Sequence, residues 1–316
     1  MRAEAVLGLW QDRDPTEAMT TARHAGELGY RRLWIGEMAT FDAFALATAV
    51  ALTVPDIEPV VGPLAVTVRT PVNIALGVAS VTTLTGRSTH VALGTSSKVV
   101  VERWHGRSRR GASDQLAATA GAVRTMLAGE RDPVSGFRLR LPPCEADIAI
   151  AAFGDKAMVA AASHADRMVL NMVTPAAAAR YRRSLDAAGA GGVGLSAWLV
   201  TAVDPTPEDI AQIRSAAVGY LAAPGYGEMF TEAGFGALVD MAREGMAPRQ
   251  LLASIPAGFE QSVGLVGSRS EVARLVDDYR ESGLASVCVV PVTASGDLGR
   301  NALGVVADLT DATGAG

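Results

Sequence analysis

The chain has little of several residue types on which specialised proteins depend. Its 316 residues include two cysteines and four histidines, and aromatic residues make up 5%. Cys144 and Cys288 cannot build a disulfide framework, which favours a reducing compartment and predicts a cytoplasmic protein. No two histidines stand at HxH or HExxH spacing, so we expect no metal site.

Excess positive charge and long apolar runs are also missing. The formal net charge is −5, which argues against nucleic acid as a partner because nucleic-acid binding needs a basic face. No apolar run approaches the roughly 18 residues of a membrane span. The start MRAEAVLGLW is typical of a first strand and not of a signal peptide. We therefore expect a small-molecule substrate, with neither nucleic acid nor a membrane as partner.

Two common signatures of enzymes do not occur. No Gly-x-Gly-x-x-Gly turn follows the first strand, which disfavours a dinucleotide-binding doubly wound sheet. The Gly-x-Ser-x-Gly elbow of serine hydrolases is absent as well. A chain with so few obvious acid–base or nucleophilic groups suits chemistry that is done by a bound cofactor.

What the chain does contain is a regular alternation of apolar runs and helical segments. We predict strands near residues 3–10, 32–36, 57–64, 89–94, 147–152, 167–172, 194–203 and 286–292. Thr70-Pro71, Thr174-Pro175 and Thr206-Pro207 each combine an N-cap residue with a proline at the first helical position. Eight alternating strands predict an α/β fold of the (β/α)8 TIM-barrel type. Residues 1–316 would form one domain, with a helical insertion at about 204–265 between strands 7 and 8.

In such a barrel the active site lies at the C-terminal mouth, so residues at the strand ends are candidates. Thr95-Ser96-Ser97 would offer hydroxyl and N–H groups to an anion at a helix start, and simple N-capping is an equal alternative. Gly154-Asp155-Lys156 would bind a phosphate through its amides and Lys156, provided that the Asp155 carboxylate turns away. Asn171 is a polar residue in an apolar run and would contact a carbonyl of cofactor or substrate.

A basic run follows the fourth strand. Lys98, Arg103, Arg107, Arg109 and Arg110 stand on a helix predicted at about 98–128, with a break near 106–111. A basic rim beside the mouth would attract an anionic ligand. A solvated helix face is the alternative.

Five segments occur in an order that a known family shares. They are GELGYRRLWIGEM, VVGPLAVTVRTPVNIAL, LTGRSTHVALGTSS, IAIAAFGDKAMVAAASHADRMVLNMV and VGSRSEVARLVDDYRESGLASVCVV. Through them the chain resembles the bacterial luciferase-like flavin and deazaflavin oxidoreductases, and it is most similar to the branch that uses the deazaflavin coenzyme F420. The resemblance implies a luciferase-like TIM barrel, an oxidoreductase activity and a homodimer.

The resemblance also implies a special third strand. Gly62-Pro63 aligns with the family's bulged strand, where a cis peptide lies under the ring of the cofactor. We therefore predict a cis Gly62–Pro63 bond. An ordinary trans turn is the alternative, since cis occurs in only about 5–6% of X–Pro bonds.

Further site residues follow from the same resemblance. The residues expected to bind the cofactor are Gly62, Pro63, Leu64, Thr95, Ser96, Ser97, Gly154, Asp155, Lys156 and Asn171. Trp10 and Met38 would line the substrate pocket. Glu37 matches the family's acidic residue at the end of strand 2 and is the catalytic candidate, with a salt-bridged rim carboxylate as the alternative. Met38 stands where many members have His, which argues against a role like that of the sugar-phosphate dehydrogenases.

The activity implied is hydride transfer between the C5 of coenzyme F420 and an unidentified organic substrate. The phosphodiester and oligoglutamate tail of this coenzyme would suit the basic run. Two alternatives remain, an FMN-dependent monooxygenase of the same fold and a non-catalytic barrel that binds a flavin.

Overall fold

A closed parallel barrel forms the centre of the protein. The computed structural model describes residues 1–8, 10–151 and 153–310, and within them nine strands make one sheet, eight of which close into a ring. The ring runs through β1 (Arg2–Leu7), β2 (Arg32–Ile35), β3 (Glu58–Ala65), β4 (His90–Gly94), β5 (Ile148–Ala151), β6 (Arg167–Asn171), β7 (Gly194–Val203) and β9 (Ser286–Pro291). Strand β9 pairs with both β7 and β1, which closes the ring. The predicted (β/α)8 barrel is therefore confirmed.

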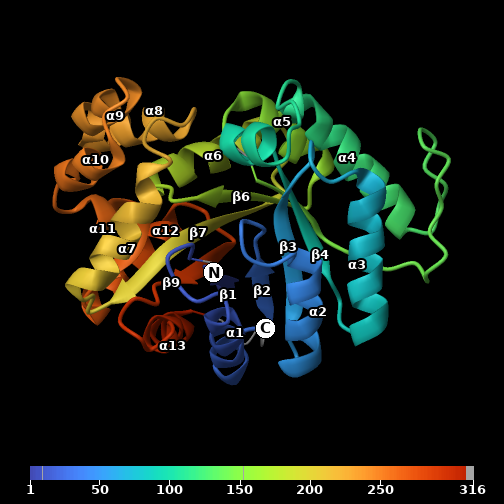
Figure 1. Cartoon of the computed structure of the whole chain (residues 1–316), viewed down its shortest axis with the longest axis horizontal. Coiled ribbons are helices and arrows are strands. Elements are labelled where there is room, and N and C mark those ends of the chain that lie inside the picture. The colour runs from blue at the N-terminus through green and yellow to red at the C-terminus, as the bar shows by residue number, and fades with distance from the viewer. Residues whose placement is uncertain (9, 152, 311–316) are drawn as a thin grey trace.

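Helices follow the strands and cover the outside of the barrel (Figure 1). They are α1 (Glu17–Glu27), α2 (Ala43–Thr53), α3 (Pro71–Thr85), α4 (Ala112–Leu127), α5 (Asp155–His164), α6 (Pro175–Ala187), α12 (Arg269–Glu281) and α13 (Arg300–Leu309). The hydroxyls of Thr70, Thr174 and Thr206 each accept from the backbone N–H three residues on, with proline between, as the sequence predicts. None of the helices in the described residues is long and apolar enough to span a bilayer.

A helical insertion separates β7 from β8 (Gly264–Gly267). It comprises α7 (Pro207–Val218), α8 (Tyr226–Phe230), the π-helical η2 (Thr231–Phe235), α9 (Gly236–Arg243), α10 (Pro248–Ser254) and α11 (Phe259–Val263). In Figure 1 helices α8, α9 and α10 stand together at the upper left of the barrel. Strand β8 pairs with residues 200–203 of β7, beyond the stretch that pairs with β6. The sequence analysis misses β8 because a strand of four residues with two glycines carries little β signal.

The predicted break in the segment at 98–128 is present. A short π-helical turn, η1 (Val99–Trp104), ends before Gly106, and α4 begins after Gly111. Both glycines have positive φ, 61° and 71°, a conformation that other residues rarely adopt.

Side chains inside the barrel are stacked in layers. The middle layer is apolar and consists of Val6, Trp34, Val60, Ala92, Ala149, Val169, Trp198 and Cys288. The rings of Trp34 and Trp198 meet edge to face, with centroids 5.8 Å apart. Two residues further along the eight strands stand Gly8, Gly36, Gly62, Gly94, Ala151, Asn171, Val200 and Val290. Five of these eight have at most a methyl group, so the layer nearer the mouth consists mainly of small residues.

Charged side chains form the floor of the barrel at its N-terminal end. Glu4 is 3% exposed, and its carboxylate accepts from Trp34 Nε1 at 2.6 Å and from Arg167 Nη1 at 2.5 Å. Arg32 pairs with Asp147 at 2.7 Å. Buried charges are tolerated when they are paired and hydrogen-bonded in this way. These ion pairs therefore close the barrel at its N-terminal end.

His90 lies in this floor and makes the stability of the protein depend on pH. Its Nδ1 accepts from the backbone N–H of Asp147 at 3.0 Å, and its Nε2 faces Glu58 Oε2 at 3.4 Å. Burial and the Arg32 guanidinium lower the pKa of His90, against the opposing pull of Asp147 and Glu58. The folded state thus disfavours a proton that the unfolded histidine takes up near pH 6.5.

We expect the free energy of unfolding to fall as the pH drops below about 6.5, by at most about 1.4 kcal/mol per pH unit from this one group. Above that pH, His90 is neutral in both the folded and the unfolded state, and it does not lower the free energy of unfolding. Urea unfolding between pH 5 and 8 measures the effect, and His90→Gln should flatten the dependence. The exposed His164 is the control, and a flattening by His164→Gln of the same size would contradict the assignment.

Candidate functional site

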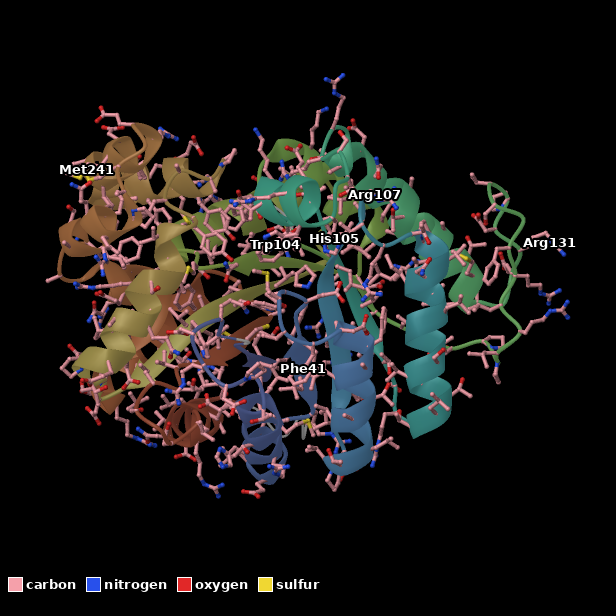
Figure 2. All side chains as sticks on the ribbon, viewed as in Figure 1. Phe41, Trp104, His105, Arg107, Arg131 and Met241 are labelled. Atoms are coloured by element: carbon pink, nitrogen blue, oxygen red, sulfur yellow. The ribbon has the colours of Figure 1, made fainter. Side chains whose placement is uncertain are left out.

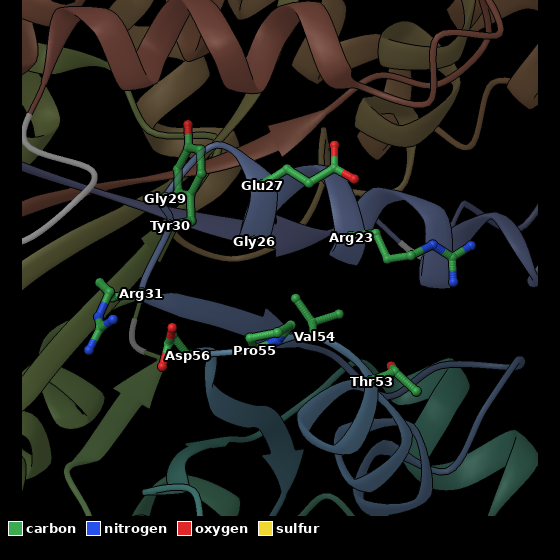
Figure 3. Close-up of a pocket in the computed structure, with 10 residues that line it drawn as sticks. All are labelled: Arg23, Gly26, Glu27, Gly29, Tyr30, Arg31, Thr53, Val54, Pro55 and Asp56. Atoms are coloured by element: carbon green, nitrogen blue, oxygen red, sulfur yellow. The ribbon is translucent and has the colours of Figure 1, made fainter.

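A hollow of about 510 Å³ lies at the floor end, outside the barrel, between the C-terminal ends of α1 and α2 (Figure 3). Its residues precede β2 and β3. Tyr30 Oη donates to the carbonyl of Leu303 at 2.8 Å, and Glu27 pairs with Arg300 at 2.6 Å. Active sites of (β/α)8 barrels lie at the opposite, C-terminal end, so the chemistry belongs to the mouth.

The third strand shapes that mouth. The Gly62–Pro63 peptide is cis, as predicted, and the pairing of β3 with β4 shifts between Val61 and Leu64. On the neighbouring strands β3 and β5, Pro63 Cβ and Ala151 Cβ would lie 3.2 Å and 3.6 Å from a Cβ built on Gly94. Even a single added carbon would crowd Pro63, so these three residues form a close-packed patch of small side chains at the mouth, here called the seat.

Thr95, Ser96 and Ser97 form the turn after β4, and Arg109 lies against them. Arg109 Nε donates to the carbonyl of Ser96 at 2.7 Å, and its Nη2 donates to Thr95 Oγ1 at 3.0 Å. Ser97 Oγ accepts from the N–H of Val100, so it caps the start of η1. The Arg109 guanidinium thus fixes the turn, and the binding of an anion or cofactor by Thr95, Ser96 and Ser97 stays a prediction.

The remaining basic side chains of the run are exposed: Lys98, Arg103, Arg107 and Arg110. Trp104, His105 and Arg107 lie close together at the upper centre of the molecule, near η1 (Figure 2). Of the five basic residues, Arg109 alone is half-buried. The run therefore has one structural member and four that face solvent.

Glu37 belongs to an ion cluster at the end of β2. Arg69 Nε donates to Glu37 Oε2 at 2.8 Å, while its Nη2 contacts both Glu37 and Asp42. Glu37 also accepts from the N–H of Ala43, and Asp42 caps α2. Arg69 has a raised pKa because both carboxylates hold its charge. Glu37 is thus a paired carboxylate at the rim, and its catalytic role stays a prediction.

Two hydroxyl groups next to this cluster have no partner. Thr40 Oγ1 and Thr67 Oγ1 are buried and make no hydrogen bond within the described part of the chain. They stand three residues after Glu37 and two before Arg69. Buried polar atoms are nearly always hydrogen-bonded, so these two hydroxyls are exceptions, and both are closed off from solvent in this structure.

Gly154 and Lys156 follow β5. The N–H of Gly154 lies 3.4 Å from Tyr181 Oη, and Lys156 Nζ lies 3.4 Å from Asp114 of α4, with both charges largely exposed. The side chain of Asp155 lies outside the described residues. Lys156 therefore points toward α4, and the phosphate role of this turn stays a prediction.

Asn171, Trp10 and Met38 complete the predicted set. Asn171 Nδ2 donates to Tyr226 Oη of the insertion at 3.2 Å. Trp10 Nε1 donates to the carbonyl of Pro291 at the end of β9, at 3.2 Å, which fixes the indole beside the mouth. The side chain of Met38 is 47% exposed.

The structure brings most predicted residues to one end of the barrel, and it adds partners that the sequence analysis does not anticipate. Arg69 is the unexpected partner of Glu37, and Tyr226 is the unexpected partner of Asn171. In addition, Arg109 turns toward the residues after β4 instead of toward solvent. Gly225-Tyr226-Gly227 is the signal that could have drawn attention to Tyr226, because glycines around one aromatic residue mark a close approach of the chain.

Comparison with known proteins identifies the family. A family model described as luciferase-like monooxygenase matches residues 3–286, and no curated protein sequence matches this chain. The chain therefore belongs to the luciferase-like monooxygenase family, whose members are oxidoreductases and monooxygenases.

Several solved structures share the fold at low identity. A coenzyme F420-dependent tetrahydromethanopterin reductase from Methanopyrus kandleri is 14% identical with a TM-score of 0.77, over 98% of this chain and 99% of that one. An F420-dependent secondary alcohol dehydrogenase is 15% identical with a TM-score of 0.73, over 99% and 98%. The oxygenating constituent of 3,6-diketocamphane monooxygenase from Pseudomonas putida, solved with FMN, is 15% identical with a TM-score of 0.67, over 97% and 96%.

Proposed function

We propose that this protein is an oxidoreductase that transfers a hydride between coenzyme F420 and a small organic substrate. The observation that carries the proposal is the bulge of β3 at Gly62 and Pro63, which with Gly94 and Ala151 presents small residues at the mouth, against which a flat ring system would lie. Two of the similar structures are F420-dependent enzymes. The coenzyme supplies the carbon that carries the hydride.

The residues present suit such a group. Pro63 would lie beside the ring, and Leu64, which is fully buried in the hydrophobic core, would support Pro63 without touching the ligand. Exposed Arg107 and Arg110 would attract the anionic tail. Glu37, held by Arg69, would position the rim of the site by keeping the β2 and β3 loops together. The aromatic groups Trp10 and Phe153 would exclude water from the mouth.

Parallel titrations with coenzyme F420 and FMN, followed by tryptophan fluorescence, test the cofactor. We expect tighter binding of F420. The double variant Arg107→Ala, Arg110→Ala should lose about five- to tenfold in F420 affinity, since each exposed charge pair contributes up to about 1 kcal/mol, and less in FMN affinity. Arg131 lies on a loop far from this region in Figure 2 and provides the control. Equal losses for both ligands would discard the role of the basic rim.

Two other functions remain in competition. The FMN-bound structure among the similar proteins supports an FMN-dependent monooxygenase. Tight binding of FMN alone, with oxygen consumption when a flavin reductase and NADH are supplied, would select it. The pairing of Glu37 with Arg69 supports a non-catalytic flavin-binding barrel, which would bind the ligand without turnover of any substrate.

A homodimer is part of the proposal, and helices α2 and α3 are its expected interface. Neither helix contains a charged residue, although both lie on the surface. Leu52, Leu76 and Leu84 of these helices are 64%, 41% and 69% exposed. An uncharged apolar face is self-complementary, as a two-fold interface requires, and neighbouring contacts between α2 and α3 make it continuous.

We expect the double variant Leu52→Asp, Leu76→Asp to be monomeric, because pairing would bury four carboxylates without partners. Sedimentation or light scattering of wild type and variant measures the change in mass. Val134→Asp is the matched control, since Val134 is 93% exposed but belongs to the connection between α4 and β5 and to neither helix of the interface. A monomeric wild type would contradict the interface.

We propose a cytoplasmic location on the basis of the two free thiols, Cys144 and Cys288.

A further inference from the structure

Two tyrosines of the insertion reach the mouth of the barrel. Asn171 ends β6, and the strand alternation that turns Val169 into the barrel turns Asn171 inward as well. Its Nδ2 donates to Tyr226 Oη at 3.2 Å. The rings of Tyr220 and Tyr226 contact each other, with centroids 4.8 Å apart. Tyr226 is therefore bonded to a polar residue of the mouth, and Tyr220 packs beside it.

The position of Tyr226 is fixed from two sides. Its ring stacks on Phe153, which follows β5, with centroids 4.1 Å apart and an interplanar angle of 24°. Gly225 has a φ of 83°, and a Cβ there would lie 3.0 Å from Phe153 Cβ. The close approach of insertion and barrel thus depends on a glycine, and it holds the tyrosine in one place.

The hydrogen bond with Asn171 leaves a proton free. Because the amide nitrogen is the donor, the bond occupies a lone pair of Tyr226 Oη, and the hydroxyl hydrogen can still be donated. Burial raises the pKa of Tyr220 and raises that of Tyr226 further, so both hydroxyls stay protonated at neutral pH. The pair is a neutral donor group in an aromatic wall.

The surroundings of the pair select the kind of acceptor. Lys156 and Arg180, the basic side chains on α5 and α6 next to this wall, are paired with Asp114 and Glu232 on the outside. A carboxylate or phosphate would need a cation when it is desolvated, whereas a neutral oxygen needs only a donor. The aromatic rings of Phe153 and Tyr226 favour an apolar body for the same ligand.

We propose that Tyr226, oriented by Asn171, and the adjacent Tyr220 form the subsite that binds the oxygen of the organic substrate, and that this substrate is a neutral carbonyl compound or alcohol with an apolar body. The inference rests on the proposed oxidoreductase function. It assigns two specificity-determining residues to the insertion, which thereby takes part in selecting the substrate.

Acetophenone labelled with ¹³C at its carbonyl is a suitable probe, and the infrared C=O stretch of the bound molecule is the readout. We expect the band to move to lower frequency than in hexane, with and without F420 present. Tyr226→Phe and Tyr220→Phe should each reverse part of the shift, and the double variant should bring the band to its position in hexane. Each lost hydroxyl should weaken probe binding by about fivefold.

Tyr30→Phe is the control, because it removes a buried hydroxyl bonded to Leu303 at the other end of the barrel. It should leave band and affinity unchanged. No binding of the probe by the wild type, an unshifted band, or a shift that survives in the folded double variant would overturn the inference. If the double variant does not fold, the single variants decide: a full shift of the C=O band in both Tyr220→Phe and Tyr226→Phe would also overturn the inference. A protein that fails to bind F420 but shows the shift contradicts the proposed function alone.

Discussion

Alanine in place of Gly62 is expected to destabilise the protein by about 3–5 kcal/mol, which is a large part of the stability of an ordinary domain. A Cβ at this position would lie 2.3 Å from the carbonyl oxygen of Ala92 and 2.7 Å from the N–H nitrogen of Leu64. Both neighbours are backbone atoms that cannot rotate away. The φ of 121° adds strain for any residue with a side chain. Strain and overpacking contribute about 1–3 kcal/mol each.

Gly86→Ala separates the two contributions. Gly86 ends α3 with a φ of 68°, but nothing lies within 4 Å of its added Cβ. It should cost about 1–2 kcal/mol from the left-handed backbone alone. Urea unfolding of the two variants and the wild type gives both values. If Gly62→Ala were no worse than Gly86→Ala, the third strand would have to yield to the added methyl, and the seat at the mouth would be less rigid than we infer.

Methionine in place of Arg167 is expected to cost about 3–5 kcal/mol, because it leaves the buried Glu4 carboxylate without its cation. The two side chains meet at 2.5 Å in the floor of the barrel. Trp34 Nε1 would remain as a donor to Glu4, but one neutral hydrogen bond does not replace a guanidinium. Methionine keeps most of the volume, so the loss reports on charge and not on a cavity.

A second change should recover part of this loss. Glu4→Gln combined with Arg167→Met removes both charges and should be clearly more stable than Arg167→Met alone. Arg124→Met serves as the surface control, since Arg124 and Asp166 are each about half exposed and such pairs contribute at most about 1 kcal/mol. The same loss in the single and double variants would show that packing, and not an unpaired charge, dominates at this position.

Local signals account for what the sequence could predict. Thr70-Pro71 begins a helix because cap and proline act within one turn, and Gly106 and Gly111 mark the break before α4. The strand ends near Glu37 and Asn171 also follow from short apolar runs, whereas β3 continues past the predicted end at Leu64 to Ala65. The cis bond before Pro63, which the structure confirms, could be predicted only through the family resemblance, since no local rule distinguishes it from a trans bond.

Contacts between distant segments could not be predicted in this way. Arg69 reaches Glu37 across 32 residues, and Tyr226 reaches Asn171 across 55. Helix and strand periodicities relate only residues a few positions apart, so no sequence pattern indicates either of these two contacts. Strand β8 was missed for a related reason, because its four residues become a strand only through pairing with β7. The candidate site was therefore predicted as a set of positions, while the bonds that orient its side chains were not.

The ion cluster of Glu37, Asp42 and Arg69 has a mechanical consequence. Asp42 caps the start of α2, and Arg69 directly precedes the cap of α3. The cluster thus clamps the first turns of both helices to the rim of the barrel. A contact that shifts the outer surface of α2 or α3 would also shift the first turn of that helix, where the ion cluster lies. Contacts on the outside of the molecule would therefore change the positions of residues at the mouth.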